Sequence, residues 1–164
     1  MKSVNEVSPG LGLLRHTLAT LAYRGAKAVR GDGSGFAGFR AAPGTRTPAE
    51  ILAHVGDLLD WALALADGQH IWHDSSPLDW DDEVSRFFRA METFEARLAS
   101  GKPVGCTPEK LFQGPIADAL THIGQISMLR RMAGHPVRGE NYYRAHIAAG
   151  VVGAEQPAPL QEFD

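Results

Sequence analysis

The chain has 164 residues, 44% of them apolar, which is enough for one globular domain with its own hydrophobic core. Its net charge of −3 and its scattered basic residues argue against a nucleic-acid surface, and no apolar run reaches the ~20 residues of a membrane span. The N-terminus lacks the apolar core of a signal peptide, and the single cysteine, Cys106, fits a reducing compartment. We therefore expect a soluble cytoplasmic protein that binds neither nucleic acid nor membrane.

Four segments have apolar residues at helical spacing, and no segment shows the alternating apolar pattern of a strand. The first helix is predicted over about residues 11–29. Its apolar stripe consists of Leu11, Leu14, Leu18 and Leu21. A Gly-rich loop over residues 31–44 follows it. The spacing therefore predicts a helix that presents one apolar face to a core.

The second helix, predicted over about residues 48–66, has clear start and stop signals. Thr47, Pro48 and Glu50 form the pattern of a capping box, in which the Thr hydroxyl accepts a backbone N–H and the Glu carboxylate reaches back. Asp67-Gly68 ends the apolar pattern.

The third helix is predicted over about residues 80–99, with Asp79 as its N-terminal cap. Acidic residues fill its first turn, where the helix dipole favours negative charge. Its core face is predicted to consist of Val84, Phe87, Phe88, Met91, Phe94 and Leu98. Gly101 and Pro103 stop it.

The fourth helix is predicted over about residues 115–133, beginning near Pro115 and capped by Gly134. Its two sides are Ile116, Leu120, Ile123 and Ser127 on one face, and Asp118, His122, Gln125 and Leu129 on the other. Both sides are poor in charge, which is typical of a helix surrounded by neighbours or buried in a dimer interface. We therefore expect a homodimer.

Four helices without strands predict an all-α protein, a four-helix bundle. The links between the helices exceed the two to eight residues usual in a tight bundle, so long crossover connections are expected. We find no repeat and no second domain, and we treat residues 1–164 as a single domain. The tail from about residue 153 has two prolines and is expected to be irregular.

Asp118 is the only charged residue between Leu111 and Leu129, and His122 follows it by four positions, on the same face of a helix. A carboxylate among apolar neighbours costs several kcal/mol unless a positive group meets it, and no Lys or Arg lies within one turn. A metal ion shared with His122 would meet that charge. His54 lies along the inward stripe of the second helix and would add a third ligand.

Each of these residues also has a simpler interpretation when it is taken alone. His54 fits a hydrogen-bonded core histidine, and Asp118 and His122 fit an ordinary pair within one helix. Their combination favours a metal, because helical bundles commonly build metal sites from facing helices.

Two segments resemble helices of the DinB/YfiT-like superfamily. Residues 51–61 read Ile-Leu-Ala-His-Val-Gly-Asp-Leu-Leu-Asp-Trp, and residues 118–126 read Asp-Ala-Leu-Thr-His-Ile-Gly-Gln-Ile, followed by Leu-Arg-Arg-Met-Ala-Gly at 129–134. The resemblance covers roughly residues 11–150. It implies a four-helix bundle that holds a divalent metal between a His of the second helix and an H-x-x-x-H pair before Gly-Gln.

By position, His54 and His122 match the first and last ligands, and Asp118 stands where the family has the middle His. A carboxylate oxygen is a harder ligand than an imidazole nitrogen. It shifts the metal preference of the site from zinc toward nickel, iron or manganese, with zinc still admissible. Gln125 is a candidate for contacting metal-bound solvent or for orienting His122. Asp57 is a candidate partner for the His54 imidazole.

The resemblance implies a metal-dependent enzyme that transfers a low-molecular-weight thiol to an electrophilic small molecule. Two alternatives stay open at this point. One is a metal-dependent hydrolase that uses the same three ligands. The other is a non-catalytic binding or stress-response module whose buried polar cluster fixes the packing of the helices.

Overall fold

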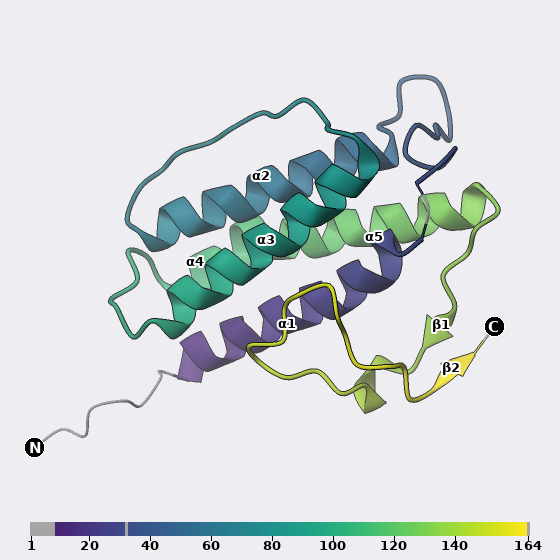
Figure 1. The fold of residues 1–164 in the computed structure, drawn as a ribbon. Helices are drawn as coiled ribbons and strands as arrows, with labels where there is room; N and C mark the ends of the chain where they lie inside the picture. The colour runs from purple at the N-terminus through teal and green to yellow at the C-terminus, as the bar shows by residue number, and fades with distance from the viewer. Residues whose placement is uncertain (1–8, 32, 164) are drawn as a thin grey trace, which may run out of the picture.

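The computed structural model describes residues 9–31 and 33–163, so the N-terminal residues of the signal-peptide argument lie outside the described part (Figure 1). The protein is mostly helical, as predicted. Its four long helices are α1 (Pro9–Val29), α2 (Pro48–Ala66), α3 (Trp80–Ala99) and α5 (Ala117–Met132). Within the described ranges, no helix is both long enough and apolar enough to cross a membrane.

The four long helices pack around a common core. Helix α2 contacts α3 and α5, and α1 contacts the same two helices from the other side. In Figure 1, α1 and α5 run in one direction while α2 and α3 run in the other. Because α2 and α3 are parallel, residues 67–79 must return along the length of α2 before α3 can begin.

The caps predicted at Thr47 and Gly134 are confirmed, and Asp79 occupies the N-cap position of α3 as predicted but makes no capping hydrogen bond. The Thr47 hydroxyl accepts the Glu50 N–H at 3.1 Å, and the Glu50 carboxylate accepts the Thr47 N–H at 2.6 Å. Gly134 takes a φ of 84° just beyond α5, a backbone conformation that favours glycine. Asp79 precedes α3 without a capping hydrogen bond from its side chain. Instead, Glu83 accepts the Leu78 N–H at 2.8 Å.

The fourth helical segment begins earlier than predicted. A short helix, α4 (Pro108–Leu111), starts after Thr107, whose side chain accepts the Lys110 N–H. It continues through a π-helical turn, η1 (Phe112–Ile116), into α5. Pro115 lies inside this wide turn. The turn therefore carries the chain past a proline that would interrupt a regular α-helix.

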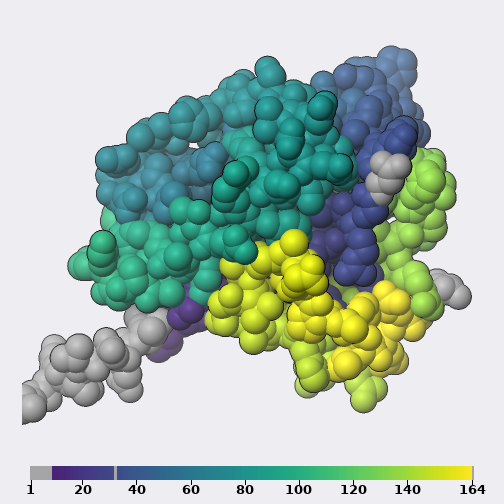
Figure 2. All heavy atoms as spheres, in the orientation of Figure 1, coloured from purple at the N-terminus to yellow at the C-terminus, as the bar shows by residue number. Residues whose placement is uncertain are grey.

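The C-terminal segment contains a small sheet that the sequence did not predict. Strand β1 (Gly139–Glu140) pairs antiparallel with β2 (Glu162–Phe163), and a 3₁₀ turn, η2 (Tyr142–Arg144), follows β1. Residues 153–161 are irregular, as predicted, but 162–163 are not. Figure 2 shows the C-terminal segment, in yellow, lying against α3.

Glu140 attaches this segment to α1. Its buried carboxylate accepts a hydrogen bond from the Tyr23 hydroxyl at 2.6 Å and another from the Lys27 ammonium group at 2.9 Å. Lys27 also lies 2.8 Å from a carboxylate oxygen of Glu162. Burial, together with Glu140, raises the pKa of Tyr23, so its phenol stays protonated and donates this hydrogen bond.

Gly25 allows α1 to approach α3 closely. A Cβ at this position would lie 2.5 Å from Cζ of Phe87, a fully buried ring. At Gly12, in the same helix, a Cβ would meet nothing within 4 Å. The two positions are therefore a matched pair in which the gain in helix propensity is similar and only the packing differs.

We predict that Gly25→Ala has a free energy of unfolding about 1–3 kcal/mol lower than that of Gly12→Ala, because overpacking forces a buried ring to move. Urea denaturation of both variants and of the wild type measures the difference. Equal stabilities would show that the α1–α3 contact is not closely packed in solution.

Candidate metal centre

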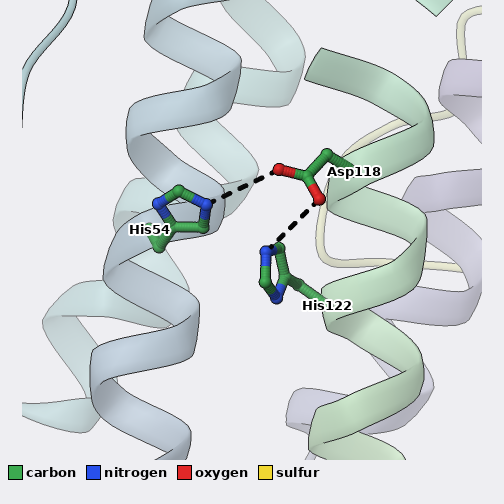
Figure 3. A group of neighbouring side chains, drawn as sticks. All are labelled: His54, Asp118 and His122. Carbon is green, nitrogen blue, oxygen red and sulfur yellow. Dashed lines mark ion pairs between the residues drawn. The ribbon is translucent and has the colours of Figure 1, made fainter. Parts of the chain in front are cut away.

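The structure brings the three predicted ligands together. His54 comes from α2, while Asp118 and His122 come from successive turns of α5, and these two helices pack against each other. One ligand atom from each side chain lies within 4.8 Å of the other two (Figure 3). Two imidazole nitrogens and one carboxylate oxygen thus meet between the helices.

Both imidazoles direct Nε2 toward the same carboxylate. His54 Nε2 lies 3.7 Å from Oδ2 of Asp118, and His122 Nε2 lies 3.5 Å from Oδ1. A tetrahedral ion with ligand bonds of ~2.0–2.1 Å holds its donor atoms about 3.3 Å apart. The three donors therefore fit a divalent ion after side-chain movements of roughly 1 Å.

Gln125 fixes the orientation of His122. Oε1 of Gln125 lies 2.9 Å from Nδ1 of His122. Because an amide oxygen only accepts hydrogen bonds, this contact places a proton on Nδ1. A neutral His122 then turns the lone pair of Nε2 toward a carboxylate oxygen. Two acceptors facing each other need a cation or a second proton between them. Of the two roles that the sequence left open for Gln125, the structure shows the contact with His122.

His54 is in the form that binds a metal. Burial is the largest cause that lowers its pKa from the usual 6.5, and the neighbouring side chains of His122 and Arg46 lower it further. Asp118 raises the pKa but does not outweigh these effects. The imidazole is therefore neutral at pH 7 and has a lone pair to donate.

Asp118 is not the buried carboxylate that the sequence suggested. Its side chain is 49% exposed, whereas those of His54 and His122 are 20% and 14% exposed. Water therefore screens much of its charge, and the fold does not need a cation to compensate for burial. The arrangement of the donor atoms, and not their burial, is what favours a metal. The homodimer stays a prediction.

The hydrogen-bond partners of Asp57 come from α3 and from the loop over residues 67–79, and the predicted pairing with His54 is not among them. Its carboxylate is almost fully buried and accepts the Arg86 guanidinium at 2.6 Å. It also accepts the Ser75 hydroxyl at 2.7 Å and the Ser75 N–H at 2.8 Å. Asp57 therefore ties the loop over residues 67–79 to α2 and α3.

This loop adds an aromatic neighbour that sequence reasoning missed. The Trp72 ring stands edge-on to the His54 imidazole at 5.7 Å between centroids and to Trp61 at 5.8 Å. His70 packs on the other indole, that of Trp61, at 5.5 Å. Trp72 is 44% exposed, so an apolar surface borders the three donors. The only signal in the sequence was Trp72 itself, which lies between His70 and His73 in an irregular loop.

A cavity of about 420 Å³ opens beside Asp118, which is the one donor of the three that lines it. Trp61 lies on one side, and Asp118 and Thr121 lie on the other. The π-helical turn contributes Gly114, against which the Trp61 ring packs. A small molecule that enters this cavity reaches the carboxylate directly. The site therefore combines three potential ligands with access for a substrate.

Comparisons of the chain with protein-family models, with curated proteins and with solved structures found no match. The interpretation of the site therefore depends on the donor geometry and on the chemistry of the surrounding side chains. Membership of the DinB/YfiT-like superfamily stays a prediction.

Asp57 and Asp60 form a matched pair for testing how much a buried ion pair stabilises the fold. Both carboxylates contact the Arg86 guanidinium, at 2.6 and 2.8 Å respectively. Asp57 is buried, whereas the side chain of Asp60 is 41% exposed. We predict that Asp57→Asn lowers the free energy of unfolding by about 2–3 kcal/mol and that Asp60→Asn lowers it by less than ~1 kcal/mol. Chemical denaturation at pH 7 measures both.

The same pair predicts a pH dependence. Burial alone would raise the pKa of Asp57, but the hydrogen bonds from Arg86 and Ser75 outweigh it and hold the pKa below 3.8. Its contribution is therefore complete above pH 3.8 and is lost as the pH falls through the lowered value. In the Asp57→Asn variant, the free energy of unfolding should therefore fall less steeply as the pH is lowered below 3.8. An unchanged acid limb would contradict the assignment.

Proposed function

We propose that this chain is a DinB-like four-helix bundle in which His54, Asp118 and His122 hold a divalent metal ion. The observation that carries the proposal is the convergence of their donor atoms within 4.8 Å between α2 and α5. Two further observations support it: burial lowers the pKa of His54, which favours its neutral form, and Gln125 contacts Nδ1 of His122 and not Nε2. Nickel, zinc, iron and manganese all suit two nitrogens and one oxygen.

We propose further that the protein transfers a low-molecular-weight thiol to an electrophilic small molecule. When bound, a divalent ion with an open position supplies positive charge that favours the anionic form of a thiol. The chain itself supplies the remaining parts. Gln125 holds the His122 ring in one orientation, and Trp72 covers the edge of His54. The cavity beside Asp118 admits the substrate.

The exposure of Asp118 weighs against the non-catalytic alternative. A polar cluster that fixes helix packing acts through the cost of leaving a buried group unpaired. A carboxylate that is 49% exposed loses little when its partners leave, because water replaces them. The hydrolase alternative uses the same ligands, so the products of the reaction must separate it from transfer.

Metal binding provides the first test. We predict that protein prepared without chelator or nickel resin binds about one equivalent of Ni²⁺ in a calorimetric titration. His54→Ala and His122→Ala should each abolish this binding, whereas His16→Ala, an exposed histidine of α1, should not. Gln125→Ala should weaken binding about 10–100-fold, because the imidazole loses its fixed orientation.

Trp72 provides a second readout of the same event. Its ring lies 5.7 Å from the His54 ring, so a paramagnetic ion at the site should quench its fluorescence. Trp72→Phe should reduce the quenching, leaving the part that comes from the neighbouring Trp61, and keep the stoichiometry. Unchanged metal content in both His54→Ala and His122→Ala would end the metal proposal.

Reaction products provide the test of chemistry. We predict that the metal-loaded protein consumes glutathione or cysteine together with a chlorodinitrobenzene, giving the thioether and chloride in equal amounts. His122→Ala should lower the rate at least about tenfold, and His16→Ala should leave it unchanged. If instead the protein bound one metal ion and cleaved an ester without consuming thiol, the hydrolase alternative would replace transfer.

A further inference from the structure

A second cavity, of about 340 Å³, lies between α1 and α5. Leu120 and Ile123 line it from the side of α5 that faces away from Asp118 and His122. Val137 and Tyr142, from the segment that follows α5, line it as well. This cavity is therefore separate from the candidate metal centre, and what it binds does not depend on the proposed function.

Arg24 is the cation in this cavity whose hydrogen-bonding capacity is not used. Its guanidinium lies 3.9 Å above the ring of Tyr142, in a cation–π contact. Among the described residues it makes no hydrogen bond or ion pair. The stacking holds the planar group in place, and its N–H donors stay available. Lys27, one turn further along α1, is in contrast paired with both Glu140 and Glu162.

The lining determines the kind of ligand that fits. A guanidinium binds a carboxylate through two parallel hydrogen bonds. The side chains of Leu120, Ile123 and Val137 favour an apolar body behind that group. Two carboxylates close by, those of Glu140 and Glu162, disfavour an anion with two charges.

We propose that this cavity binds a small monocarboxylate with an apolar body, and that Arg24 receives its carboxylate. The ligand places its apolar part against α5 and its charge at the rim beside Tyr142. Arg24 is a binding residue here and has no part in the chemistry at the metal centre.

Benzoate is the probe for this proposal, and benzamide is its neutral control of nearly equal shape. In a titration followed by two-dimensional ¹⁵N–¹H NMR, benzoate should give saturable shifts at the Gly124 amide and at the Arg24 side-chain N–H. Benzamide should bind at least about tenfold more weakly, because it offers no charge to the guanidinium. This comparison uses the unaltered protein.

Arg24→Gln should weaken benzoate binding at least about tenfold, and Arg89→Gln, which removes an exposed arginine of α3, should leave it unchanged. Arg24→Lys keeps the positive charge but loses the planar guanidinium group. Its affinity for benzoate should therefore lie between those of the wild type and Arg24→Gln. Three outcomes would overturn the proposal: equal binding of benzamide, equal effects of the two glutamine variants, or phosphate binding as tightly as benzoate. The absence of any saturable shift would overturn it too.

Discussion

The contact between α2 and α5 sets the distance from His54 to Asp118, and the candidate metal centre exists only because these helices are neighbours. Asp118 and His122 lie on one face of α5 by virtue of their four-residue spacing, so they would be adjacent on any helix. His54 belongs to a helix more than 60 positions earlier in the sequence. Its position depends on the apolar core that α2 shares with α3 and α5, which includes Leu52, Val55 and Leu59.

The order of the helices in space explains why the site has an aromatic border. Because α2 and α3 are parallel, the loop over residues 67–79 has to cross the length of α2. Asp57 fixes the loop by accepting two hydrogen bonds from Ser75, and Arg86 holds Asp57 from α3. Trp72 is thereby held beside His54. A buried ion pair one turn away from the ligands thus supports the surroundings of the site without contacting the ligands themselves.

The features that sequence reasoning identified correctly depend on local periodicity. The capping box at Thr47, the turn at Gly134 and the apolar face around Phe87 follow from the preferences of single residues and from helical spacing. The start of the fourth helical segment differs from the prediction, because Pro115 resembles the first residue of a helix but lies inside a π-helical turn. Thr107 is followed by proline, as Thr47 is, but it lacks the Glu that completes the capping box at Thr47. A π-helical turn then carries the helix past Pro115.

The errors at the site have a different cause. Whether Asp118 is buried depends on which neighbours cover that face of α5, and periodicity alone does not determine this. Trp72 was missed because residues 69–79 have no regular structure, so its place beside His54 follows from the buried anchor at Asp57. The three donor residues could be predicted from their residue types. Their exposure and the neighbouring Trp72 ring could be determined only from the tertiary structure.

The exposure of Asp118 also decides how the site relates to the stability of the fold. The core of the protein is one continuous apolar cluster, and the three donors lie at its edge. In structural metal sites the binding energy of the ion is needed for folding, because the metal-free chain lacks a sufficient core. Here the helices already share a core, and water screens the carboxylate when no ion is bound. An ion bound at the proposed site would therefore be exchangeable while the helices remain packed. That independence suits a site that binds and releases small molecules better than one that holds a fold together.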